Sequence, residues 1–225
     1  MPSQPGLRKS TTPRAGALAG VVFALLFGAV LILIRTKMPE GVQGSAEWLA
    51  SRRGGIATAT VLMPFAGISF LWFIGVVRDG LGRHEDRFFS TVFLGSGLLF
   101  LAMMFVSMSL AAGLVATNTA ATNPAAHAEM IDFGKMVVLS SAKTYAVRMA
   151  AVFMMSLATM WLRTGLMPRW LVGLSYLAAV VLLLASDVSM WVTMALPVWV
   201  LVVSALLLAR AGLFEQLRAT GHSTD

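Results

Sequence analysis

Long apolar stretches occupy most of this 225-residue sequence. A helix needs about 20 mostly apolar residues to cross the hydrocarbon core of a bilayer, and the usual range begins at about 17. Several stretches of this length alternate with short polar segments. We therefore predict an all-α integral membrane bundle of about six transmembrane helices, at residues 15–34, 56–77, 88–117, 136–162, 170–186 and 188–209.

The composition supports lipid as the solvent for most of the chain. Hydrophobic residues make up 58% of it and charged residues 12%, whereas ordinary soluble domains carry about 25% charged residues. The polar segments 1–14 and 210–225 are predicted to be cytoplasmic tails, the first of them disordered. The net charge of +7 does not indicate nucleic-acid binding, because the Lys and Arg residues are dispersed among the apolar stretches.

The distribution of Lys and Arg predicts the orientation of the chain. If the N-terminus is inside, ten of these residues fall on the inner side and five on the outer side. Cytoplasmic loops retain positive residues, so both termini are predicted to be cytoplasmic. The outer segment 35–55 is an exception, since it carries four cations. Within it, residues 45–53 could form a short helix lying on the membrane, with Trp48 and Leu49 toward lipid.

The fourth stretch, residues 136–162, carries polar side chains where a span should be apolar. Arg148 would lie near the bilayer midplane, where a cation costs about 2.5–3.5 kcal/mol on insertion scales. It is therefore expected to face the bundle interior or a wet cavity. At about 100° per residue, one helical face collects five polar residues and Lys143 lies at its margin; the five are Ser140, Ser141, Thr144, Tyr145 and Arg148.

These two cations need partners. Asp187 stands between the fifth and sixth stretches, at a depth that could match Lys143, and would form a salt bridge with it. Arg148 has no obvious carboxylate, so its partners would be backbone carbonyls, hydroxyls such as those of Ser175 and Tyr176, water or an anionic ligand. One alternative is that Arg148 only ties helices together through carbonyls.

We therefore predict a non-enzymatic membrane protein that binds or passes a small anion or a lipid headgroup at this face. A guanidinium offers five donors in a planar fork suited to carboxylate or phosphate. The predicted ligand-binding residues are Arg148, Lys143, Tyr145, Ser141, Thr144 and Asp187.

Signs of catalysis or of a cofactor are lacking in the sequence. There is no cysteine, which excludes thiolate metal sites and iron–sulfur clusters. The three histidines, His84, His127 and His222, lie outside the predicted spans, so intramembrane haem ligation is not expected. A phosphate-binding Gly-rich loop, an H-E-x-x-H motif and a pair of intramembrane carboxylates are all missing. Neither an enzyme, a cofactor nor a bound metal is predicted.

Small residues recur every four positions in the first stretch, at Gly16, Gly20, Ala24 and Gly28. This strip of small residues leaves a smooth helix face that permits close packing against another helix. The partner could be a second copy of the chain or a different protein. The alternative function is therefore an accessory or structural subunit of a larger membrane protein complex.

The segment Arg78–Phe89 reads R-D-G-L-G-R-H-E-D-R-F-F and leads into the third stretch. In a chain rich in Ala, Val, Leu and Arg, this pattern resembles small multi-span membrane proteins of unknown function in high-GC bacteria. The resemblance extends over about half of the chain. It implies a location in a bacterial inner membrane and supplies no activity or functional residues.

Overall fold

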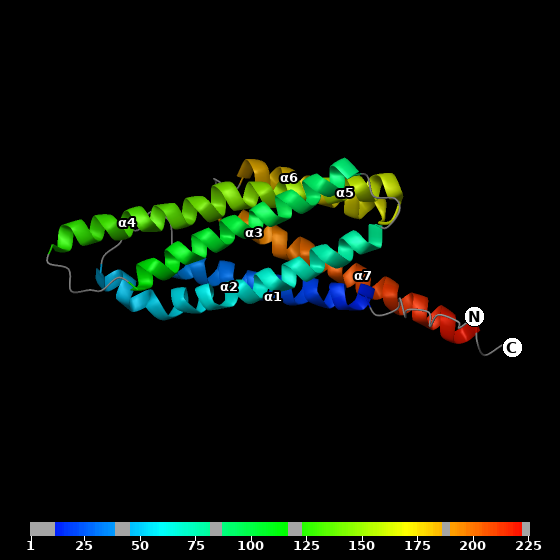
Figure 1. Cartoon of the computed structure of the whole chain (residues 1–225), viewed down its shortest axis with the longest axis horizontal. Coiled ribbons are helices and arrows are strands. Elements are labelled where there is room, and N and C mark those ends of the chain that lie inside the picture. Colours follow the sequence, from blue (N-terminus) through cyan, green and yellow to red (C-terminus); the bar gives the residue numbers. More distant parts are fainter. Residues whose placement is uncertain (1–11, 39–45, 82–86, 117–122, 186–189, 222–225) are drawn as a thin grey trace, which may run out of the picture.

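The computed structural model describes residues 12–38, 46–81, 87–116, 123–185 and 190–221. Every regular element in these residues is helical, which confirms the all-α prediction (Figure 1). In chain order the elements are α1 (Thr12–Lys37), α2 (Ala46–Leu81), α3 (Arg87–Ala116), α4 (Pro124–Ser140), the π-helix η2 (Ser141–Ala146), α5 (Val147–Thr164), α6 (Arg169–Ala185), the 3₁₀ helix η3 (Met190–Met194) and α7 (Ala195–Gly221).

The helices run lengthwise along one elongated bundle, and helices joined by a connecting loop are antiparallel (Figure 1). The segments α4, η2 and α5 form one continuous rod. Helix α1 packs against α2 and α7, whereas α5 packs against α3 and α6. We call the end that holds the start of α1 the terminal end, because α7 also leaves the bundle there. The opposite end, which holds the starts of α2 and α4, is the distal end.

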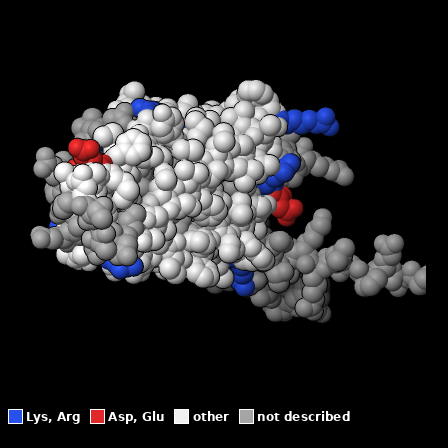
Figure 2. Space-filling view, turned by 60° about the vertical axis from the view of Figure 1, so that its left-hand side comes forward, with Lys and Arg blue, Asp and Glu red and all other residues white. Residues whose placement is uncertain are grey.

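The bundle has the character of a membrane protein. Of the described helices, five are long and apolar enough to cross a membrane, and α6 is a shorter apolar helix. Figure 2 shows one face on which the described charged residues gather toward the two ends and leave an uncharged band between them. This architecture is compatible with a multi-pass membrane protein.

The polar segment 118–135, predicted as a loop, is helical from Pro124 onward. The side chain of Asn123 accepts hydrogen bonds from the backbone N–H groups of Ala125 and Ala126 at 3.1 and 3.3 Å. Proline is well suited to the first position of a helix, because its missing N–H would have no partner there. The continuous run Ala125–Thr164 has 40 residues and is therefore about 60 Å long, twice the hydrocarbon thickness of about 30 Å.

The predicted surface helix at residues 45–53 is also different, because from Ala46 it forms the first turns of α2. Leu49 is buried in the core rather than turned toward lipid. Trp48 is half-buried, and the ammonium of Lys135 lies 5.0 Å from the centre of its ring. Because α4 begins earlier than predicted, it covers this part of α2. This explains why Leu49 and Trp48 are not turned toward lipid.

The last helix is longer than predicted as well. The segment 210–225 was expected to be a polar tail, yet α7 continues to Gly221. Figure 1 shows this part of α7 projecting beyond the other helices at the terminal end. The N-terminal tail, apart from residues 12–14, lies outside the described residues.

Aromatic side chains fill the centre of the bundle. The ring of Phe70 lies 4.6 Å from that of Phe23, 5.3 Å from that of Phe100 and 5.3 Å from that of Phe153. These four rings come from α1, α2, α3 and α5, and all are fully buried. We call this group the aromatic core; its other members are Phe27, Phe73, Phe93 and Trp199.

The strip of small residues on α1 is used within the chain. A side chain at Gly16 would collide with Val76 of α2, and one at Gly20 would collide with Phe73 and Ser204. Ala24 is buried too. Only around Gly28 is there open space on the strip. Gly16 and Gly20 are therefore covered by α2 and α7 and Ala24 is buried within the chain, which leaves little of this face for another protein.

Candidate functional site

A π-helix interrupts the long rod at the polar segment that the sequence singles out. Between Ser141 and Ala146 the backbone is π-helical, and the N–H of Val147 donates to the carbonyl of Ala142, five residues back. A π-turn holds one residue more than an α-turn, and such turns occur often at functional sites. The extra residue rotates everything after it by about 100° relative to a regular α-helix.

The five polar residues of the predicted face differ in how exposed they are. Ser141 is buried with 7% of its surface exposed, whereas Tyr145, four residues later, is 58% exposed. Ser140 is exposed, and Thr144 and Arg148 are half-buried. The five polar residues therefore range from buried to exposed, and the buried surface of this segment is mainly made by Ala142, Ala146 and Val147.

Arg148 bonds to its own helix. Its Nη1 donates to the carbonyl oxygen of Thr144, inside the π-helix, at 3.0 Å. The two hydroxyls considered as its partners bond elsewhere: Ser175 accepts from the indole N–H of Trp199 at 2.7 Å, and Tyr176 shares a hydrogen bond of 2.6 Å with Thr159. This geometry fits an arginine that satisfies a carbonyl at an irregular turn.

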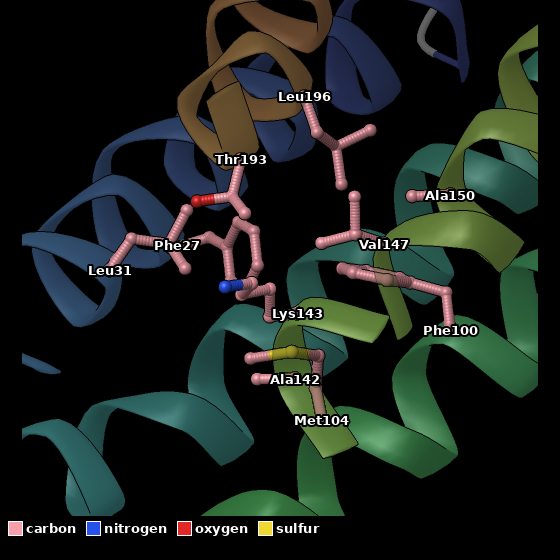
Figure 3. Close-up of a pocket in the computed structure, with 10 residues that line it drawn as sticks. All are labelled: Phe27, Leu31, Phe100, Met104, Ala142, Lys143, Val147, Ala150, Thr193 and Leu196. Atoms are coloured by element: carbon pink, nitrogen blue, oxygen red, sulfur yellow. The ribbon is translucent and has the colours of Figure 1, made fainter. Parts of the chain in front are cut away.

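The other cation, Lys143, lines a small cavity inside the bundle (Figure 3). The cavity volume is ≈ 20 Å³. One water molecule needs at least about 10–15 Å³, so the space suits a water molecule or a monatomic ion and is too small for a lipid headgroup. The lining residues are Phe27, Leu31, Phe100, Met104, Ala142, Lys143, Val147, Ala150, Thr193 and Leu196.

Four separate parts of the chain build this cavity. Helices α1 and α3 supply aromatic and aliphatic walls, η2 supplies Lys143, and η3 supplies Thr193. Figure 3 shows the Lys143 side chain extending toward the part of the cavity formed by α1 and η3. Ser107 of α3 helps to fix the rod beside it, because its hydroxyl donates to the carbonyl of Val138 at 2.8 Å.

The cavity lies toward the distal end of the bundle. Its α1 residues Leu31 and Phe27 are one and two turns before Arg35, which places them about 6 and 12 Å from that residue along the helix. On the terminal side, the rings of Phe27 and Phe100 lie 5.5 Å apart and continue into the aromatic core. The cavity is therefore closed toward the terminal end.

The chemistry of the lining suits an anion. An ammonium group has three donors and no acceptor, and the hydroxyl of Thr193 can donate as well. The lining residues, all within the described part of the chain, include no carboxylate. A positive charge in apolar surroundings repels a cation and attracts an anion strongly, because the surroundings screen little.

Asp187, the predicted salt-bridge partner of Lys143, lies outside the described residues, so that pairing stays a prediction. Asp187 precedes Thr193 by six positions in the sequence. Thr193 itself was missed, and no motif marks it, because it reaches the cavity only through the packing of η3 against α1 and α6.

Comparisons of the chain with protein-family models, with curated proteins and with solved structures found no match, so no known activity can be carried over to this cavity.

Proposed function

We propose that this protein is a non-enzymatic, six-span protein of a bacterial inner membrane that binds a small anion at Lys143. Both termini are then cytoplasmic. The observation that supports this function best is the ammonium group of Lys143 in a small, otherwise apolar cavity inside the bundle. The sequence favours Arg148 as the binding residue, whereas we propose Lys143, the cation five residues earlier.

The backbone around the cavity favours an ion site. Two of its walls are irregular helices, the π-helix η2 and the 3₁₀ helix η3. At membrane depth, irregular backbone is tolerated where it is buried in protein or lines a polar cavity. Discontinuous helices that meet at a charged group are also typical of ion and substrate sites in transporters.

The position of Lys143 inside the bundle favours the same function. Ionisable residues within a membrane are expensive and are most often functional. The cavity volume of ≈ 20 Å³ limits a ligand at Lys143 to a halide or an anion of similar size. The lipid headgroup considered from the sequence is not proposed for this cavity.

Binding is favoured over free passage. The aromatic core separates the cavity from the terminal end, and its rings are fully buried. An anion could cross only if Phe27 and Phe100 moved apart. Transport would therefore be a second step, in which binding at Lys143 precedes a rearrangement of these rings.

The charges at the terminal end support a cytoplasmic location for that end. Arg163 of α5 lies with its guanidinium 4.6 Å from the ring of Phe89 at the start of α3, and Arg210 of α7 donates to the carbonyl of Leu166. Arg14, Arg78 and Arg87 belong to helix ends at the same side. Clusters of arginine beside spans are retained on the cytoplasmic side.

The test is thermal unfolding of the purified protein in one mild detergent, with chloride exchanged for gluconate at constant ionic strength. A ligand present at about 100 times its Kd raises the free energy of unfolding by about 2.7 kcal/mol, which is about 5–10 °C for a chain of this size. We expect chloride to give such a shift in the wild type and no shift in Lys143→Met. Arg148→Met removes the same charge five residues away, so it should keep the shift while lowering both melting temperatures.

Two outcomes would count against the proposal. If Arg148→Met abolishes the chloride shift and Lys143→Met keeps it, the anion binds at Arg148. If neither chloride nor bromide stabilises the wild type, Lys143 has a structural role and the accessory-subunit function is favoured. A further variant, Asp187→Asn, tests the predicted salt bridge. If Asp187 pairs with Lys143, removing this carboxylate should increase the rise in melting temperature that chloride causes.

A further inference from the structure

A cation–π contact lies on the distal side of the Lys143 cavity. The guanidinium of Arg35, near the end of α1, is 4.0 Å from the centre of the Trp191 ring in η3. Each partner is a close neighbour of a lining residue: Arg35 is one turn beyond Leu31, and Trp191 is two residues before Thr193. The contact therefore joins two walls of the cavity just outside it.

The Arg35–Trp191 contact lies at the boundary between exposed and buried residues. Trp191 is 55% exposed, whereas Thr193 is 5% exposed and Leu196 is fully covered. On the terminal side the aromatic core closes the cavity. Among the described residues, Arg35 and Trp191 are therefore the neighbours of the lining residues Leu31 and Thr193 on the distal side of the cavity.

The end of α1 is held independently of Arg35. Arg52 of α2 donates to the carbonyl of Thr36 at 3.0 Å, and the stem of Lys37 covers Gly55 of α2. These contacts anchor the last turn of α1 on α2. The Arg35 side chain can leave Trp191 without releasing the helix, so any opening would involve this side chain and η3.

We propose that Arg35 and Trp191 form a latch over the distal side of the cavity, and that an anion bound for Lys143 first draws Arg35 away from the indole ring. This inference rests on the proposed anion binding at Lys143. A guanidinium on the face of an exposed indole is held weakly, and its five donors suit an anion better than a ring. Arg35 is then the first residue to contact the anion and Lys143 is the second.

The absence of cysteine from the sequence makes a direct test possible. Ala142→Cys places one thiol in the cavity wall beside Lys143, and Ala150→Cys places one on the same wall as a second reporter. The rate of modification by the small neutral reagent methyl methanethiosulfonate is measured on folded protein in detergent. We expect Arg35→Gln and Trp191→Leu each to raise this rate by about two- to fivefold, the factor that corresponds to a cation–π contact at an exposed site. Arg53→Gln, which removes the same charge from an exposed side chain of α2, should leave it unchanged.

Chloride distinguishes the latch from the anion site. If both are right, the latch variants are modified faster and chloride slows modification of the reporter. If chloride slows modification while Arg35→Gln and Trp191→Leu leave the rate at the control value with both reporters, the latch is wrong and the anion site stands. If the latch variants are modified faster and chloride has no effect on any variant, the Arg35–Trp191 contact does cover the cavity, but the proposed anion binding at Lys143 fails, and with it the claim that an anion draws Arg35 away.

Discussion

Lys143 and Arg148 are two cations on one rod with different chemical roles. The lysine has a flexible apolar stem and a compact charge, so it can lie along Ala142 and Val147 and still present its ammonium to the cavity. The arginine has a planar fork, and it uses one arm on the carbonyl of Thr144. A mutation of either residue removes one positive charge, and only the lysine change removes the charged donor from the cavity.

Helix α1 packs closely against α2 and also supplies two residues to the cavity. Gly16 lies directly under Val76, whereas the position of Gly28 faces open space. The same helix, α1, supplies Phe27 and Leu31 to the cavity and Arg35 to its distal side.

Gly16→Ala should destabilise the protein by about 1–3 kcal/mol, because the added methyl group meets the branched carbons of Val76 and the helices must separate. Gly28→Ala is the matched control. It should leave stability unchanged or raise it by up to about 1 kcal/mol, since alanine is the better helix former. Unfolding of both variants is followed in the same detergent; equal stabilities would mean that α1 and α2 are not in close contact at Gly16.

The ends of a helix could be predicted where charged residues flank an apolar run. They could not be predicted where packing against other helices determines them. The third stretch was predicted at 88–117, and α3 spans Arg87–Ala116, because charged and polar residues flank a long apolar run. The start of α4 was missed because Asn123–Pro124, a helix-start pair, lies among small polar residues that resemble a loop. The π-helix has no sequence signal that we recognise. Lys143 was identified as a candidate, yet its cavity depends on η3, which is remote in the chain.

At the scale of the whole molecule, the sequence places its surplus of positive charge at the terminal end. Of the cations assigned to the inner side, those in the described residues lie in helix segments at that end, and the five assigned to the other side lie in the distal segments. If the terminal end is cytoplasmic, as we propose, the cavity lies nearer the outer surface. The proposed anion would then reach Lys143 from outside the cell.

Single cysteines test this orientation. Gly80→Cys lies at the exposed end of α2 with open space around it, and Ala126→Cys lies at the exposed start of α4. In intact cells, a membrane-impermeant thiol reagent should label Cys at position 126 and leave position 80 unlabelled until the cells are opened. The reverse pattern would invert the bundle and place the Arg35–Trp191 contact on the cytoplasmic side.

The most direct measurement is anomalous diffraction from crystals of the protein grown with bromide. The account predicts an anomalous peak within hydrogen-bonding distance of Lys143 Nζ, between η2 and η3, and its loss in Lys143→Met crystals grown in the same way. A wild-type crystal with bromide peaks elsewhere and none at Lys143, or a peak there that persists in Lys143→Met, would contradict it.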